Sequence, residues 1–214
     1  TYLQDCGGAN INQNAVFMEC FMDELAEYAG VDPVEFRRKY SANYPRNLAV
    51  LNAVADRIGW TKPAPPGVFR GIAQQKSFGS FVAAACELSV TDGNKVKIHR
   101  IVAATDPGYA VNPAQIERQV SGSFVYGLSA LFEEECTVKN GRIEQTNFDT
   151  FGSIRLKQMP KVETIIIQGG GKEWGGIGEP TISVAAPAVL NAFYRATGKR
   201  IRTVPLKNSG ITLV

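Results

Sequence analysis

The residues best suited to chemistry are Gly175-Gly176-Ile177-Gly178-Glu179-Pro180, a glycine-lined turn that carries one carboxylate. The residues that follow, 181–197, have the pattern of a helix, and Pro180 suits the first helical position. The dipole and free N–H groups of a helix start favour an ionised carboxylate, and the glycines let a bulky group approach. An ionised carboxylate on an open loop is what a general base requires. A helix cap has the same position, so these residues leave two interpretations of Glu179, a base or a cap.

Residue types exclude several other chemistries. The single histidine, His99, lies in a predicted strand with an exposed side chain, so neither a histidine-rich metal cluster nor a Ser-His-Asp triad is expected. The four cysteines are far apart and form neither an iron–sulfur nor a zinc pattern. We therefore expect no metal ligands from this chain. The run Gly169-Gly170-Gly171-Lys172 completes no phosphate-binding motif, and we interpret it as a mobile loop leading into the Glu179 turn.

Composition indicates a globular protein. With 214 residues, of which 44% are hydrophobic, the chain can form one large core or two small ones. Basic and acidic residues number 23 and 20 and are interspersed, which predicts no nucleic-acid partner and no membrane-binding face. No apolar run approaches the roughly 18 residues of a transmembrane helix, so we expect no transmembrane segment in this chain.

Helix signals dominate the first sixty residues. We predict helices over residues 14–29, from Asp32-Pro33 onward, and over 48–58. The first of these has an apolar face, formed by Phe17, Phe21, Leu25 and Tyr28.

A proline-rich stretch at residues 62–67 follows and predicts a stiff connector. It divides the chain into a helical segment at 1–62 and an α/β region at 68–214. The elements predicted in the second region are, in order, strands at 78–90 and 95–104, a helix at 113–131, a hairpin around 139–141, a strand at 162–168, the helix at 181–197 and a strand near 201–206. This order predicts an α/β or α+β fold of mixed sheets with packed helices.

Small residues gather on the predicted helix at 113–131, including Ser121, Gly122, Ser123 and Gly127. Small side chains allow another backbone or a ligand to approach closely. Tight packing against a sheet and contact with a ligand both fit this pattern.

A series of longer motifs runs along the chain. They are Arg70-Gly71-Ile72-Ala73, Asp106-Pro107-Gly108, Gln119-Val120-Ser121-Gly122-Ser123, Gly176-Ile177-Gly178-Glu179-Pro180 and Ala196-Thr197-Gly198-Lys199-Arg200. In this order and spacing they resemble the C-terminal part of the large, molybdenum-binding subunit of the xanthine dehydrogenase and aldehyde oxidase family. The likeness is strongest to the bacterial isoquinoline 1-oxidoreductase β-subunit type, and residues 14–37 extend it toward the N-terminus.

The resemblance implies a molybdenum hydroxylase, an oxidoreductase acting on an aldehyde or an N-heteroaromatic with oxygen derived from water. In this family a molybdenum centre is held by a pterin dinucleotide, expected here in its cytosine form. The glutamate of the Gly-x-Gly-Glu motif takes a proton from a hydroxyl whose oxygen then attacks an electron-poor carbon. Carried over, Glu179 is the catalytic base and Gln119 contacts the cofactor. Gly176 and Gly178 leave room for the ligands of the metal, although either glycine can also serve packing.

The chain also departs from the family. No arginine precedes Arg37, which leaves cofactor contacts from Gly7, Gly8 or Gln13 open, and two cofactor-binding loops of the family are absent. We therefore expect a fragment of a longer catalytic subunit, inactive when isolated. Its expected partners are the remainder of that subunit, a polypeptide holding [2Fe-2S] clusters and a small-molecule substrate. The alternative is a non-catalytic binding or assembly module that retains the fold. The compartment is left open.

Overall fold

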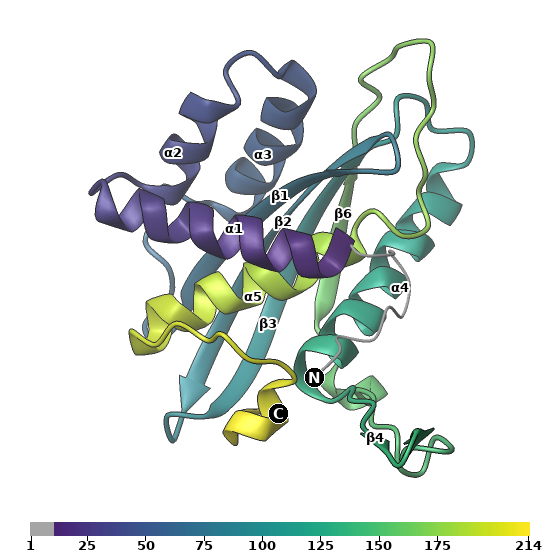
Figure 1. Ribbon diagram of the computed structural model, residues 1–214. Coiled ribbons are helices and arrows are strands. Elements are labelled where there is room, and N and C mark those ends of the chain that lie inside the picture. The colour runs from purple at the N-terminus through teal and green to yellow at the C-terminus, as the bar shows by residue number, and fades with distance from the viewer. Residues whose placement is uncertain (1–10) are drawn as a thin grey trace.

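The computed structural model describes residues 11–214, arranged as Figure 1 shows. Its helices are α1 (Ile11–Tyr28), α2 (Pro33–Tyr40), α3 (Pro45–Ile58), α4 (Pro113–Phe132) and α5 (Ile182–Thr197), with 3₁₀ turns at Leu156–Gln158 and Leu206–Ser209. Its strands are β1 (Phe69–Ser77), β2 (Ser80–Thr91), β3 (Lys95–Asp106), β4 (Val138–Lys139), β5 (Arg142–Ile143), β6 (Lys161–Ile166) and β7 (Thr212–Leu213). The predicted α+β class is confirmed.

The main sheet is mixed, with the strand order β1-β2-β3-β6 and with β7 paired to the start of β3. The first three strands are antiparallel, whereas β6 and β7 run parallel to β3. Helix α5 packs over β1 and β2, α1 packs on α5, and α4 lies beside α5 and β6 (Figure 1). Helix α3 covers the opposite face. Alternate residues of β2 therefore enter two cores: Ala84 and Cys86 face the α5 side, and Ala83 and Ala85 face α3.

Local signals set most helix ends. The Asp32 carboxylate caps α2 by accepting from the amides of Val34 and Glu35, at 2.8 and 3.2 Å. Helices α3 and α5 end at Gly59 and Gly198, both in the left-handed conformation. These predicted starts and stops are confirmed.

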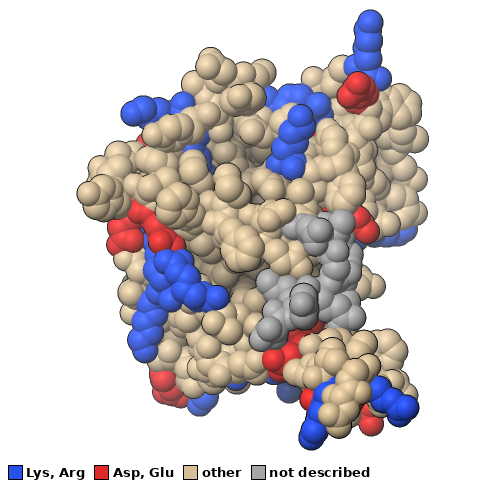
Figure 2. Space-filling view, in the orientation of Figure 1, with Lys and Arg blue, Asp and Glu red and all other residues tan. Residues whose placement is uncertain are grey.

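The predicted apolar face of α1 is wrong. Phe17, Phe21 and Tyr28 are 65%, 57% and 94% exposed, and the buried side of the helix includes the acidic residues Glu19 and Asp23. Figure 2 shows this face of the molecule as largely uncharged, with acidic and basic side chains gathered at the C-terminal end of α1.

Buried ion pairs explain this orientation of α1. The fully buried Arg37 of α2 donates to Glu19 at 2.8 Å, and Arg200 donates to Asp23 at the same distance. Glu19 also accepts from the backbone amide of Gln74 in β1, at 2.9 Å. Acidic residues can be buried when they are paired and hydrogen-bonded, which hydrophobic periodicity does not detect.

Two strand predictions need correction, and a third is confirmed with shorter strands. Strand β1 is absent from the sequence prediction; it pairs with β2 through a turn at Phe78 and Gly79, which both have positive φ. The strand predicted near 201–206 is wrong, because residues 201–204 join no strand among the described residues and a 3₁₀ turn begins at Leu206. The hairpin at 139–141 is confirmed, but β4 and β5 have only two residues each.

Within residues 11–214, no helix has both the length and the apolar character needed to cross a membrane. Residues 34–58 share one hydrophobic cluster with β1, β2 and β3, so α3 belongs to the packing of the sheet. The division into segments 1–62 and 68–214 stays a prediction.

Candidate functional site

Glu179 lies in the turn that leads into α5, with its side chain exposed. The helix begins at Ile182 with Thr181 as its N-cap, so Pro180 does not occupy the first helical position, contrary to the prediction. The amide of Ile182 closes the turn by donating to the Glu179 carbonyl at 3.0 Å. Among the described residues, the Glu179 carboxylate accepts no hydrogen bond and forms no ion pair. It therefore does not cap α5 and is open to solvent.

The glycines of this turn have different surroundings. A Cβ at Gly175 would stand 2.1 Å from Ser80 Oγ, and one at Gly176 would stand 3.3 Å from the Cβ of Phe78. The amide of Gly176 donates to the Phe78 carbonyl at 2.8 Å. A Cβ at Gly178 would meet no atom within 4 Å, and its φ is not left-handed. Packing within the described chain accounts for Gly175 and Gly176 but not for Gly178.

The loop before the turn is anchored by the buried carboxylate of Asp106, at the end of β3. Oδ1 of Asp106 accepts from the amides of Gly108 and Gly169 at 2.9 and 3.0 Å. Arg46 donates to both carboxylate oxygens, at 2.7 and 2.9 Å. A Cβ at Gly169 would stand 2.1 Å from Oδ2, so only glycine fits there. The glycine run predicted as a mobile loop is thus bonded to the sheet.

Opposing effects act on the Asp106 carboxyl. Burial by itself would raise its pKa, but hydrogen bonds from Arg46, Gly108 and Gly169 outweigh burial and hold the pKa below its usual range. The sequence showed Asp106 only as part of the Asp106-Pro107-Gly108 motif and did not single out Arg46. No local signal connects residues 60 positions apart.

Gln119 is exposed on α4, one helical turn before Ser123. Ser123 Oγ lies 2.6 Å from Thr181 Oγ1, in the buried contact between α4 and the cap of α5. Residues four apart lie on a similar side of a helix. Gln119 thus lies one helical turn along α4 from the residue that contacts Thr181, and among the described residues no hydrogen bond joins Gln119 to Glu179.

Helices α4 and α5 cross closely at Gly127. A Cβ at this position would stand 2.5 Å from the Cβ of Ala185 and 3.2 Å from the carbonyl oxygen of Ile182. The tight packing predicted from the small residues is confirmed here, although the partner is a helix and not a sheet. At Gly122, in contrast, a Cβ would meet nothing within 4 Å.

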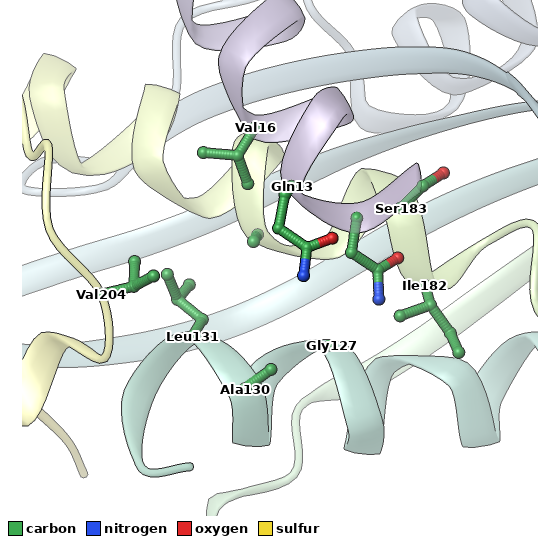
Figure 3. Close-up of a pocket in the computed structure, with 10 residues that line it drawn as sticks. Gln13, Val16, Gly127, Ala130, Leu131, Ile182, Ser183 and Val204 are labelled. Carbon is green, nitrogen blue, oxygen red and sulfur yellow. The ribbon is translucent and has the colours of Figure 1, made fainter. Parts of the chain in front are cut away.

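A small cavity of about 40 Å³ lies where α1, α4 and α5 meet. Figure 3 shows Gln13, at the start of α1, extending over α4 toward Gly127 and Ala130. Ligand pockets generally measure about 300–1,000 Å³, so this cavity is too small for a pterin. Gly7 and Gly8, the other residues whose cofactor contacts were left open, lie outside the described residues.

Residues 11–214 contain no group of three or more histidine, cysteine or acidic side chains arranged to hold a metal ion. His99 is exposed in β3, as predicted, with Nε2 2.9 Å from Ser89 Oγ. Burial raises the pKa of Cys20 to about 12 and also raises the pKa of Cys86. Both thiols are therefore protonated at neutral pH and are poor nucleophiles.

The molybdopterin cofactor-binding domain family matches residues 49–160, just over half of the chain. The chain belongs to this family. The matched residues include β1, β2, β3 and α4 with Gln119, and Glu179 lies beyond them. The family resemblance drawn from the motifs is confirmed.

Curated relatives agree with this assignment, and a solved structure shares the fold. The chain is 27% identical to the β-subunit of isoquinoline 1-oxidoreductase from Brevundimonas diminuta, over 94% of this chain and 26% of that protein. It is also 27% identical to a nicotinate dehydrogenase subunit of Pseudomonas putida, over 93% of this chain and 18% of that protein. The aldehyde oxidoreductase of Desulfovibrio gigas shares the fold, with a TM-score of 0.71 and 14% identity over 92% of this chain and 40% of that one. The chain thus spans about a quarter or less of the length of these curated relatives.

Proposed function

We propose that this chain is part of a molybdenum hydroxylase that oxidises an aldehyde or an N-heteroaromatic compound with oxygen derived from water. The family assignment supports this proposal, as do relatives named for isoquinoline and nicotinate oxidation. The observation that carries it is the exposed carboxylate of Glu179, which has no partner among the described residues and lies in a glycine turn at the start of α5.

The surroundings of Glu179 suit a large polar cofactor. The described residues give no packing reason for glycine at 178, so a group outside the chain that needs this space explains it. The exposed amide of Gln119 offers a donor and an acceptor to the polar edge of a pterin. When bound, the molybdenum cofactor supplies a Lewis-acidic centre and accepts two electrons from the substrate.

The chain's own residues have distinct roles in this proposal. The Glu179 carboxylate accepts a proton at its oxygen atoms, as a general base must. Gly176 and Gly178 keep side chains out of the approach to the carboxylate. Thr181, held by Ser123 at 2.6 Å, fixes the turn relative to α4 and Gln119.

Further proposals concern the assembly around the chain. We infer that the pterin is the cytosine dinucleotide and that [2Fe-2S] clusters on a partner polypeptide receive the electrons. We also infer that the chain needs the remainder of the catalytic subunit for turnover. Molybdenum bound stoichiometrically to the isolated chain, together with turnover of an N-heterocycle, would refute this last inference.

The test of the catalytic role is Glu179→Gln in the complete enzyme. A general base contributes about 10²–10⁴-fold to rate, so we expect kcat to fall by at least about 100-fold while molybdenum content and folding survive. The matched control is Glu173→Gln, which alters another exposed carboxylate of the same loop and should leave kcat unchanged. Loss of folding in Glu179→Gln would indicate a structural role instead.

Metal analysis of the complete protein, purified with its partners, tests the cofactor. We expect about one molybdenum per catalytic subunit, with iron from the partner polypeptide. A correctly folded complex without molybdenum would favour the alternative, a binding or assembly module that retains the fold.

A further inference from the structure

Strand β6 is the outermost strand on its side of the main sheet (Figure 1). Among the described strands it pairs only with β3. The amide of Ile167, just after the strand, donates to the Thr105 carbonyl of β3 at 2.9 Å. The backbone groups of Ile167 therefore face β3, as do those of Ile165 and Glu163. Because the backbone groups of successive strand residues point to opposite sides, every second residue of β6 faces away from β3. These residues are Val162, Thr164 and Ile166.

A groove of about 650 Å³ runs along this open edge. Arg57 of α3 lines it on one face of the sheet, and Glu117, Arg118 and Ser121 of α4 line it on the other. The strand itself forms the floor, since Val162 and Ile166 pack into the core on the α5 side and Ile165 packs toward α3. The groove is therefore a slot with the backbone of β6 at its base.

The edge has only part of the protection that natural edge strands carry, a lysine at its first position, Lys161. Its sequence, Lys161–Ile166, is rich in β-branched residues and has no proline or glycine. Its one acidic residue, Glu163, is already bonded to Arg57 at 2.8 Å. Edge strands with little protection act as templates for another strand. We propose that an extended segment of the molybdenum-binding subunit, from outside these 214 residues, pairs with β6 and adds a strand to the sheet.

Two observations favour this occupant over a second copy of the chain. The chain spans 26% of the isoquinoline subunit, and its fold spans 40% of the aldehyde oxidoreductase chain, so most of a comparable subunit lies outside it. The edge also lies between side chains of α3 and α4. In a second copy of the chain, the same side chains would flank the edge of its β6. Pairing two copies edge to edge would bring both sets of α3 and α4 side chains against each other, whereas an extended segment without flanking helices brings none of its own.

Residue-resolved amide hydrogen exchange in the complete subunit tests the pairing and does not depend on turnover. We expect the amides of Val162, Thr164 and Ile166 to exchange at least about 100-fold more slowly than in an unfolded peptide. The amides of Glu163 and Ile165, which face β3, serve as internal controls. The proposal would be overturned if the two control amides exchanged slowly while those of Val162, Thr164 and Ile166 exchanged as fast as in an unfolded peptide.

Thr164→Pro and Thr164→Val form a matched pair of variants. Proline removes the central outward-facing donor and spares the hydrogen bonds to β3, and an edge strand tolerates proline where its N–H faces away from the sheet. We expect exchange at Val162 and Ile166 to accelerate at least about tenfold in Thr164→Pro and to stay unchanged in Thr164→Val. Equal protection in the two variants contradicts strand addition.

The occupant is identified by cross-linking. A photoreactive amino acid at position 118, on the wall of the groove, should link to a peptide of the same subunit that lies outside residues 1–214. The same probe at Val138, in the exposed β4–β5 hairpin, should not capture that peptide. Cross-links only to a second copy of this chain, or to no polypeptide, would overturn the proposal. This test does not use the Thr164 variants, so it holds even if Thr164→Pro fails to fold.

Discussion

The hydroxyl groups of Ser123 and Thr181 lie 2.6 Å apart, although 58 residues separate them in the chain. Ser123 also donates to the Val120 carbonyl at 2.7 Å, and a hydroxyl has only one proton to donate. Thr181 is therefore the donor to Ser123. Because Thr181 occupies the N-cap position of α5, two residues after Glu179, this buried bond fixes the Glu179 turn against α4.

Ser123→Ala should destabilise the chain. The change leaves the Thr181 hydroxyl buried without an acceptor, which costs about 1–3 kcal/mol in the free energy of unfolding. Urea denaturation measures the loss, and Ser121→Ala, on the same helix but only partly buried, serves as the control. Equal effects of the two substitutions would show that the hydroxyl pair adds no stability.

Gly127→Ala and Gly122→Ala should have opposite effects. At position 127 the new Cβ overlaps Ala185, so we expect α4 and α5 to separate at a cost of about 1–3 kcal/mol. At position 122 nothing lies within 4 Å, and alanine should stabilise the helix by about 0.5–1 kcal/mol. Thermal unfolding of both variants measures this difference. Two shifts of the same sign would contradict the close crossing of the helices.

Asp106→Asn should loosen the loop before the Glu179 turn. The amide NH2 that replaces Oδ2 is a donor facing the Arg46 Nε–H, so the ion pair is lost and these groups are left unpaired, which costs about 1–3 kcal/mol. The uncharged amide oxygen at the Oδ1 position still accepts from Gly108 and Gly169, but more weakly than the carboxylate does. Chemical denaturation at neutral pH measures the cost. Stability equal to the unsubstituted chain would contradict the anchoring role of Asp106.

The contribution of Asp106 should also depend on pH. Its folded pKa lies below the usual carboxyl value, so the stabilisation is complete above the unfolded pKa of about 3.9 and is lost as pH falls through the folded pKa. We therefore expect the difference in unfolding free energy between the unsubstituted chain and Asp106→Asn to stay constant from about pH 5 to 8 and to shrink in stronger acid. A difference that persists at the lowest pH would contradict the pKa direction.

The exposed aromatic side chains of α1 should promote self-association of the isolated chain. Phe17 and Phe21 lie on one exposed face, and contiguous apolar surface drives association in water. Replacing both with serine should lower the associated fraction measured by sedimentation velocity. Phe148→Ser, at an exposed site in the loop after β5, is the control, and an equal decrease there would show that the α1 face has no special role.

Local structure followed from the sequence because its signals act over a few residues. The Asp32 cap, the Gly59 and Gly198 stops and the hairpin turn at Asn140 depend on neighbouring backbone groups, and each lies where the pattern predicted it. The ordered motifs likewise indicated the molybdopterin-binding family. The role of Glu179 stays a proposal, although the sequence placed its carboxylate correctly on an open glycine turn.

Only the tertiary structure decided which distant groups meet. Hydrophobic periodicity gave the wrong face of α1, because Glu19 and Asp23 are buried through pairing with Arg37 and Arg200. The same limit applies to the anchoring of the glycine loop by Asp106 and to the hydroxyl pair that holds the Glu179 turn. Local pattern carries no information on such pairings, since their free energy arises from desolvation and hydrogen bonding that exist only once the chain has folded.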